Sequence, residues 1–148
     1  MRRSGIDGES AMTDQDFLKR ATEVGNRKAK PYNYGTVIVK DGKIIGEDFN
    51  HVHETLDPSA HAEISALKMA TKAYGNHNLN GATMYGSHEP CVMCAACAAW
   101  AGVDRIVYAV RAIDQELRYE PVGMTLEEFV THLQNRTMVV EYIPLENL

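Results

Sequence analysis

The sequence predicts an α/β protein in which a β-sheet carries helices on both faces. Segments rich in β-branched residues alternate along the chain with segments that carry helix-start and helix-end signals, and this alternation is typical of α/β folds. The chain has 148 residues, of which 45% are apolar and 24% charged, as expected of one domain with one core. We therefore expect a single domain over residues 1–148, in which the polar residues 1–12 form a flexible N-terminal tail.

The first half of the chain contains a helix and then a hairpin. A helix is predicted from Thr13 to about Lys28, because Thr13 and Asp16 have the spacing of a capping box. Two short strands are predicted around an Asp-Gly turn, which is the strongest short signal for a β-hairpin: they span Thr36–Val39 and Lys43–Ile45.

A second helix is predicted from Pro58 to Tyr74. Proline suits the first position of a helix, Asp57 is placed to cap it, and Gly75 suits its end. The same signals predict the later elements: strands over Ala82–Gly86, Arg105–Val110 and Met138–Ile143, and helices over Pro90–Ala101 and from the capping box Thr125–Glu128.

Charge and composition indicate which kinds of molecule the protein binds. The net charge is −5, whereas proteins that grip a nucleic-acid backbone usually have a basic surplus, so we expect small-molecule substrates rather than nucleic acid. The N-terminus lacks the apolar run of a secretory signal, and no stretch approaches the about 18 apolar residues that cross a bilayer. The expected location is the cytoplasm, without membrane contact.

The cysteines indicate a metal site. All three, Cys91, Cys94 and Cys97, lie within one short segment, which is a poor disulfide framework but typical of metal or redox chemistry. Cys91 and Cys94 are spaced i, i+3 at the start of a predicted helix, where the thiolate form that binds metals is favoured. Cys97 is one turn further on and is expected to be a small core residue.

The segment His61-Ala62-Glu63 supplies what a catalytic zinc site would need in addition. His61 is a candidate third ligand, and a set of Cys, Cys and His leaves one tetrahedral position open, as in catalytic zinc sites. Side chains two positions apart in a helix diverge by roughly 200°, so His61 and Glu63 converge on a metal only if it lies beyond the helix start. Glu63 is then a candidate general acid–base that takes a proton from the water on the zinc and passes it to a departing amine.

The pairing of H-x-E with P-C-x-x-C resembles the zinc-dependent cytidine and deoxycytidylate deaminase superfamily. The resemblance extends from about Tyr34 to Val110 and is greatest to the branch of guanine deaminases, tRNA adenosine deaminases and fungal cytosine deaminases. It implies a hydrolase acting on C–N bonds of cyclic amidines, with a three-layer α-β-α fold around a five-stranded mixed sheet. This branch usually forms homodimers.

By the same resemblance His61, Cys91 and Cys94 bind Zn²⁺, Glu63 shuttles protons, and Asn50 hydrogen-bonds the base. Four further residues complete the expected site or its surroundings. Ala62 lies within the H-x-E motif, Trp100 matches a tryptophan of guanine deaminases, Asp114 belongs to a segment (residues 111–123) that could close the site, and Glu89 matches an acid common before Pro-Cys.

Three substrates and one non-enzymatic role remain open at this point. Acidity, compact size and Trp100 favour a free purine, with guanine converted to xanthine as the first choice. The Asp57-Pro58-Ser59 segment is also typical of tRNA wobble-adenosine deaminases, although the basic C-terminal helix of those enzymes is absent. Cytosine or another pyrimidine is the third alternative. The role of a different class is a non-catalytic binding module stabilised by zinc.

Overall fold

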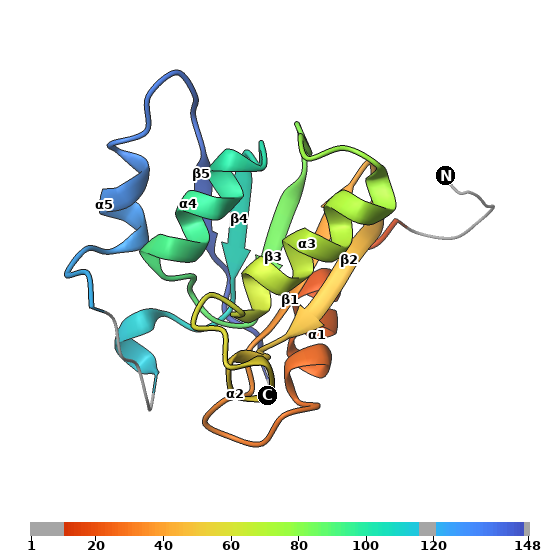
Figure 1. Cartoon of the computed structure of the whole chain (residues 1–148), viewed down its shortest axis with the longest axis vertical. Coiled ribbons are helices and arrows are strands. Elements are labelled where there is room, and N and C mark those ends of the chain that lie inside the picture. The colour runs from red at the N-terminus through yellow and green to blue at the C-terminus, as the bar shows by residue number, and fades with distance from the viewer. Residues whose placement is uncertain (1–10, 116–120, 147–148) are drawn as a thin grey trace.

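Five strands form one mixed β-sheet in the order β2-β1-β3-β4-β5 (Figure 1). The computed structural model describes residues 11–115 and 121–146. Strand β1 (Gly35–Lys40) runs antiparallel to β2 (Lys43–Phe49) and to β3 (Thr83–Gly86). Strands β3, β4 (Arg105–Tyr108) and β5 (Val139–Tyr142) run parallel. The expected five-stranded mixed sheet is confirmed.

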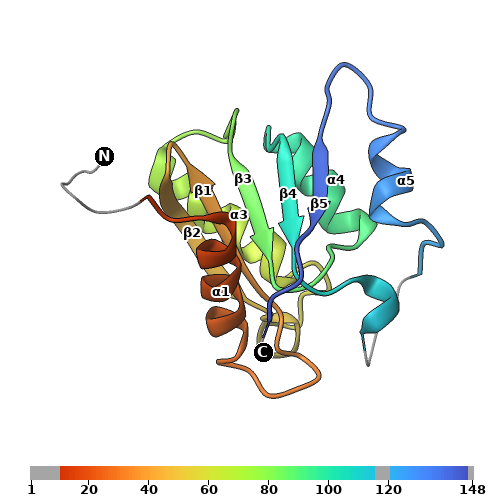
Figure 2. The same ribbon diagram turned by 180° about the vertical axis from the view of Figure 1, so that it is seen from behind.

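Helices cover both faces of the sheet. Helix α1 (Asp14–Gly25) packs on one face, whereas α3 (Ala62–Tyr74), α4 (Val92–Trp100) and α5 (Leu126–Val130) cover the other (Figures 1 and 2). No helix of the described residues is long and apolar enough to cross a membrane.

Strand alternation divides the core into two clusters. Val37 and Val39 point toward α1, where they pack with Phe17, while Ile38 between them points to the opposite face and packs with α3 residues such as Leu67. Strands β3 and β4 alternate in the same way, which gives each face its own apolar layer. The three-layer α-β-α arrangement follows from this alternation.

The predicted local signals account for most element ends. Thr13 and Asp16 form a complete capping box at the start of α1, and the hairpin turns through Asp41 and Gly42, both with positive φ (52° and 77°). The second capping box opens α5. Residues 1–10 of the predicted tail lie outside the described residues, and residues 11–12 precede α1 without regular structure.

The predicted start of the second helix is wrong by four residues. Pro58 belongs to a turn, closed by the Ala60 N–H donating to the Asp57 carbonyl at 3.1 Å, and the Asp57 carboxylate accepts from Ser59 N–H at 2.9 Å. The turn uses Asp57 locally, so α3 begins at Ala62 with His61 as its N-cap. Two short elements were also not predicted: α2 (Val52–Thr55) and the 3-10 helix η1 (Ala112–Asp114).

The sheet brings four connecting segments to one edge. Because β1 is antiparallel to β2 and β3, the N-terminal end of β1 lies beside the C-terminal ends of those two strands, and the parallel β4 ends at the same edge. The segments around Tyr34, Asn50, Ser87 and Val110 therefore meet there. Ligand sites of α/β sheets form at such edges.

Candidate active site and metal centre

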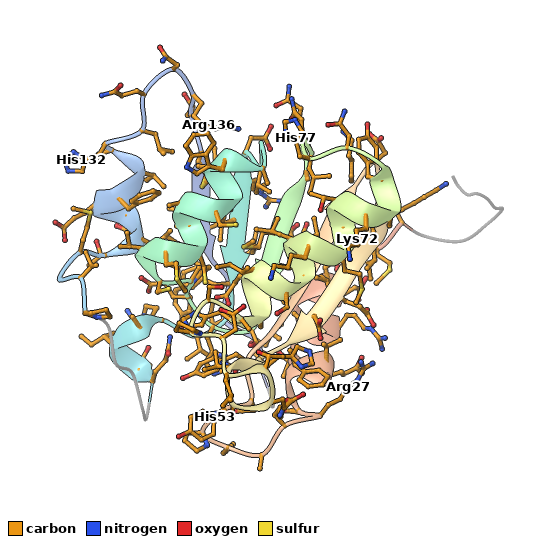
Figure 3. The ribbon with its side chains drawn as sticks, viewed as in Figure 1. Arg27, His53, Lys72, His77, His132 and Arg136 are labelled. Atoms are coloured by element: carbon orange, nitrogen blue, oxygen red, sulfur yellow. The ribbon has the colours of Figure 1, made fainter. Side chains whose placement is uncertain are left out.

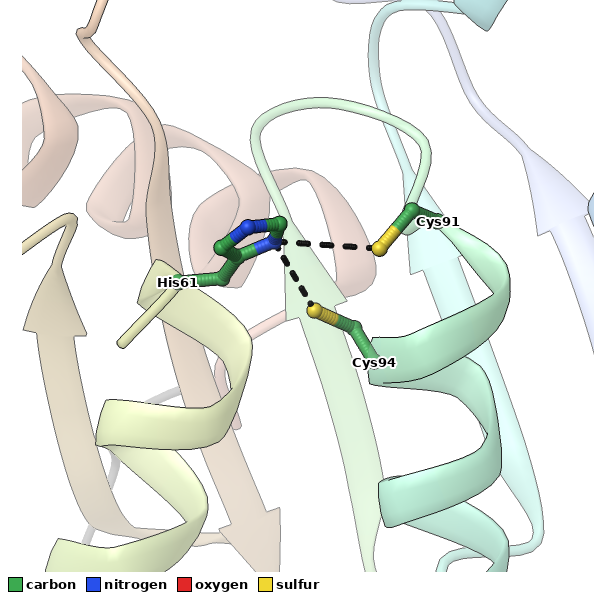
Figure 4. Close-up of side chains that lie close together, drawn as sticks. All are labelled: His61, Cys91 and Cys94. Atoms are coloured by element: carbon green, nitrogen blue, oxygen red, sulfur yellow. Dashed lines mark hydrogen bonds between the residues drawn. The ribbon is translucent and has the colours of Figure 1, made fainter. Parts of the chain in front are cut away.

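Two helices begin at this edge with a potential metal ligand as the N-cap. His61 is the N-cap of α3 and Cys91 is the N-cap of α4, and neither side chain makes a capping hydrogen bond to its own helix. Instead the two side chains face each other, and Cys94, from the first turn of α4, joins them (Figure 4). The Nδ1 of His61 lies 3.4 Å from the Sγ of Cys94 and 3.7 Å from the Sγ of Cys91.

These three side chains fit a zinc ion. Their ligand atoms all lie within 4.8 Å of one another, and one imidazole with two sulfurs is a donor set that zinc prefers. Cys94 is fully buried, whereas His61 and Cys91 also line an adjoining cavity. Three protein ligands beside a cavity are typical of a catalytic rather than a structural zinc site.

The two ligand sulfurs differ in their tendency to ionise. The Cys94 thiol donates a hydrogen bond to Cys91, and this bond, together with that from His61, outweighs burial and lowers the pKa of Cys91 to about 4. The same hydrogen bond, followed by burial and the nearby Glu63 carboxylate, raises the pKa of Cys94. The lowered pKa favours the thiolate form of Cys91, which is the form that binds metal.

A cavity of about 400 Å³ opens in front of the triad. Its lining comes from all four segments of the sheet edge and from both helix starts: Tyr32, Tyr34, Asn50, Val52, His53, His61, Ala62, Glu63, Glu89, Cys91 and Gln115. The Glu63 side chain belongs to the first turn of α3 and is 8% exposed. The structure thus brings His61, Glu63, Asn50 and Ala62 to one cavity, and their roles in it stay predictions.

The Asn50 side chain makes a hydrogen bond to the nearby backbone and also lines the cavity. Its Oδ1 accepts a hydrogen bond from the Val52 N–H at 2.9 Å, which starts α2, and its side chain lines the cavity. Since Oδ1 is engaged by the backbone, Nδ2 is the amide group that remains for a ligand. The Asn50 side chain thus closes a turn and lines the cavity at the same time.

A second cavity of about 400 Å³ lies next to the first, and Tyr34 and Gln115 line both. Its other walls are mostly polar and come from the segment after α1 and from the ends of β3 and β4: Thr22, Asn26, Lys30, Pro31, Asn33, Ser87, His88, Val110 and Asp114. His88 packs edge-on against the Tyr34 ring at 4.7 Å.

Two residues that were predicted as substrate contacts, Trp100 and Asp114, do not line the first cavity. Trp100 is the last residue of α4, at the opposite end from Cys91, and it is 88% exposed. Helix α4 has nine residues, of which Trp100 is the last, so the length of the helix separates Trp100 from its N-cap Cys91. Asp114 lines only the second cavity, because its carboxylate turns outward to the Arg111 guanidinium at 2.9 Å.

Several wall residues were not predicted as substrate contacts, notably Tyr32, Tyr34, His53 and Gln115. Tyr32 and His53 contact each other edge-on at 4.7 Å, and Figure 3 labels His53 beside α2 at this end of the molecule. The available signal was positional: Tyr34 immediately precedes one strand, and Gln115 follows another after a short turn. That signal is useful only once the strand order is known.

Glu89 connects one wall of the first cavity, at η1, to the loop that carries Cys91. Its carboxylate accepts a hydrogen bond from the Ala112 N–H at 2.9 Å, and its own N–H donates to the Val110 carbonyl at 2.8 Å. These bonds fasten η1 to the loop that carries Cys91, two residues after Glu89. The resemblance singled out Glu89 by sequence, and the structure gives it this anchoring position.

Residues 11–110 match the model of the cytidine and deoxycytidylate deaminase zinc-binding region. The chain is 40% identical over 106 residues to a guanine deaminase of Bacillus subtilis, covering 70% of this chain and 68% of that protein. It is 39% identical over 94 residues to a tRNA-specific adenosine deaminase of Agrobacterium fabrum, covering 64% of this chain and 60% of that protein. A solved structure from a study of tRNA A34 deaminases superposes with a TM-score of 0.69 at 28% identity, covering 84% of this chain and 95% of that one.

Proposed function

Because the chain belongs to the cytidine and deoxycytidylate deaminase family, and is thereby a hydrolytic deaminase, we propose that its substrate is a free nucleobase, with guanine converted to xanthine and ammonia as the best fit. The observation that supports this proposal is the set of side chains that line the first cavity. Two carboxylates and two tyrosines line it, and no lysine or arginine of the described residues does.

Such a lining suits guanine for physical reasons. The amino group and ring N–H of guanine are hydrogen-bond donors, which the carboxylates of Glu63 and Glu89 complement. Flat rings pack against aromatic side chains such as Tyr32 and Tyr34. A phosphate, by contrast, needs cationic partners, and the net charge of the chain is −5. The relative named guanine deaminase gives the same preference.

His61, Cys91 and Cys94 are proposed to hold the zinc ion that the family model includes. Zinc, when bound, supplies Lewis acidity and makes water a nucleophile near neutral pH. The chain itself supplies the fixed position of the donors, because two of them are N-caps of rigid helices.

Glu63 is proposed as the general acid–base. Its carboxylate is almost fully buried and lines the cavity two residues after His61. There it can accept a proton from the attacking water and deliver it to the ring nitrogen. It can then accept the remaining proton of the added hydroxyl, as the carbonyl forms, and deliver it to the amino group, which leaves as ammonia when the C–N bond breaks. Burial protects this proton transfer from bulk water. Asn50 Nδ2 and the wall formed by Ala62 are proposed to orient the ring while it reacts.

Deamination of adenosine in tRNA is the second candidate, because one observation favours it. The second cavity shares Tyr34 and Gln115 with the first and includes Lys30, so it offers a polar space beside the base that neighbouring nucleotides would need. The relative from Agrobacterium fabrum carries that activity in its name. The acidic first cavity and the net charge weigh against it.

An ammonia-release screen on the purified, zinc-loaded protein tests the proposal. The substrates are guanine, cytosine, adenine, their nucleosides and a tRNA anticodon stem-loop, and zinc content is measured in the same samples. We expect the highest kcat/KM with guanine. Turnover of the stem-loop alone would establish the second candidate, turnover of cytosine alone would indicate a pyrimidine deaminase, and zinc without any ammonia release would indicate a binding module.

A further inference from the structure

We propose that Gln115 is a specificity-determining residue whose side-chain amide donates a hydrogen bond to an acceptor on the base, either a ring carbonyl oxygen or an unprotonated ring nitrogen, which in guanine are O6 and N7. The acceptor lies on the edge of the base that faces η1. This inference rests on the proposed deamination of a free base and adds the feature by which the site distinguishes that base from its analogues.

The first observation is the place of Gln115 in the wall. Among the residues that the structure describes, it is one of two that line both cavities, the other being Tyr34. A base held against the triad in the first cavity therefore has the Gln115 side chain on one of its sides. Asp114, the preceding residue, faces outward to Arg111, so Gln115 is the polar side chain of this turn that lines the first cavity.

The second observation is an unused hydrogen-bond donor. The Nε2 atom of Gln115 is buried and has no acceptor among the described residues. Buried polar groups in native structures almost always have partners, and one that lacks a partner calls for a specific explanation, such as a role in catalysis or a bound water or ion. An acceptor atom on a bound base would satisfy this amide, whereas a base without one would leave it unsatisfied.

The third observation is that the backbone of Gln115 is held in a fixed relation to the metal ligands. The Gln115 N–H donates to the Ala112 carbonyl at 3.1 Å, and the Ala112 N–H donates to the Glu89 carboxylate at 2.9 Å. Glu89 precedes Cys91 by two residues. A side chain whose backbone is held before the ligand arrives has less freedom to lose on binding, which favours discrimination.

The polar groups of the first cavity then divide into two kinds. The carboxylates of Glu63 and Glu89 accept hydrogen bonds when ionised, whereas the amide groups of Asn50 and Gln115 can donate them. A ligand that matches this pattern has donors on one part of its edge and acceptors on another. Guanine does, with its amino group and N1–H on one side and its O6 and N7 acceptors on the other.

The test compares wild type with Gln115→Leu on three substrates: guanine, 2-aminopurine, which lacks O6, and 7-deazaguanine, which lacks N7. The ratio of variant to wild-type kcat/KM is taken within each substrate, so that intrinsic reactivity cancels. We expect Gln115→Leu to lower kcat/KM for guanine about 10- to 100-fold, mainly through KM. For the analogue that lacks the recognised acceptor, the ratio should be close to one.

One control variant and one alternative variant make the result specific to the side-chain amide of Gln115. Ile113→Gln changes the same turn at a side chain that is 84% exposed and lines neither cavity, and it should leave every ratio near one. Gln115→Met keeps the length of the side chain and removes its hydrogen bonding, so it replaces Gln115→Leu if that variant has a lowered melting temperature or zinc content.

Equal ratios for guanine and both analogues would overturn the role of Gln115, as would an unchanged kcat/KM for guanine. Failure of the proposed function is a separate result, namely no guanine turnover by the wild type. In that case the comparison of Gln115→Leu with wild type is made on the base that the screen identifies and on analogues of that base that each lack one acceptor. Equal ratios of variant to wild-type kcat/KM on all of these substrates again overturn the inference.

Discussion

The imidazole of His61 and the thiol of Cys91 lie 3.7 Å apart, Nδ1 to Sγ, although 30 positions separate them in the chain. Each is the N-cap of a helix, and the two helices pack side by side on the same face of the sheet. The positive ends of both helix dipoles therefore point at the metal site, where they favour thiolate and carboxylate groups. The packing of α3 against α4 brings the metal ligands together. The metal site can therefore be tested by measuring metal content as well as activity.

The purified protein should carry about one zinc ion per chain, as a site of three borderline or soft ligands predicts. His61→Ala and Cys91→Ala should each deplete the metal, as measured by inductively coupled plasma mass spectrometry, and should lower the melting temperature of the isolated protein, because metal that binds only the folded state stabilises it.

Cys97→Ala is the matched control for these variants. Cys97 packs against the core cluster and is not among the three clustered ligand atoms, so its replacement should leave zinc content unchanged. Full zinc retention in both ligand variants would contradict the assignment of the triad.

Glu63→Gln should keep the zinc and the fold but lose nearly all turnover. The amide has almost the same volume as the carboxylate and leaves the three proposed ligands untouched, but it cannot accept and return protons. Since Glu63 is proposed to serve several proton transfers, kcat should fall at least 10³- to 10⁴-fold, the upper end of the usual general acid–base contribution. Steady-state ammonia release measures this. A variant that retains zinc and more than about a tenth of wild-type kcat would show that another group carries the protons.

Binding to tRNA should be weak, and binding to free bases should be independent of salt. The net charge is −5 and the first cavity has no cationic wall residue among those described, whereas binding to a nucleic-acid backbone depends on Lys and Arg and weakens steeply with salt. Titrations between low and moderate salt, with a tRNA stem-loop and with guanine, measure both. Tight stem-loop binding that collapses with salt would reverse the order of the two proposed substrates.

The stability of the protein should depend on the protonation of His51. Burial lowers the pKa of His51, but its hydrogen bonds to Glu54 at 3.0 Å and Asp48 at 2.6 Å outweigh burial, and the net pKa is raised above the usual 6.5. The other charged group nearby is Lys28, which pairs with Glu54 and lies over the Phe49 ring that His51 also contacts. The folded state therefore favours protonated His51.

A raised pKa means that this stabilisation is complete below about pH 6.5, the unfolded value, and is lost as the pH rises through the higher folded value. The melting temperature of wild type should fall over that interval by about 3 °C at most, given the partial exposure of the carboxylates. His51→Gln should remove this dependence, and His77→Gln, at an exposed histidine, should retain it. An identical pH profile for wild type and His51→Gln would contradict the assignment.

Gly35→Ala should destabilise the fold. A Cβ at Gly35 would lie 2.0 Å from the Ala21 carbonyl oxygen and 2.3 Å from the Gly25 nitrogen, both of them backbone atoms of α1. The helix would have to move off β1, and overpacking of this kind costs about 1–3 kcal/mol or more. Gly123→Ala, where nothing lies within 4 Å, is the control and should be neutral within about 0.5 kcal/mol. Urea denaturation of both variants gives the comparison, and equal midpoints would show that α1 accommodates the methyl group.

Residue type and spacing along the chain are enough to predict the residues at the centre of the site. His61, Cys91 and Cys94 were predicted as ligands from residue type and spacing, and Glu63 as their acidic neighbour. Spacing along a helix start and the order of two short motifs are local properties, so they can be read without knowing where the helices pack. Capping boxes and the Asp-Gly turn were readable for the same reason. The start of α3 was missed because Asp57 closes a turn on Ser59 instead of capping a helix, a choice between two local hydrogen bonds.

The residues that form the wall of the cavity could not be predicted from the sequence, because they depend on how the strands are ordered. Tyr34, His53 and Gln115 come from three separate connections, and they meet because β1 is antiparallel to β3 while β4 is parallel to it. Sequence reasoning selected Trp100 by its distance from a cysteine, yet the direction of α4 carries it away from the metal to the surface. Strand order and helix direction depend on contacts between residues far apart in the chain, and no local pattern encodes them.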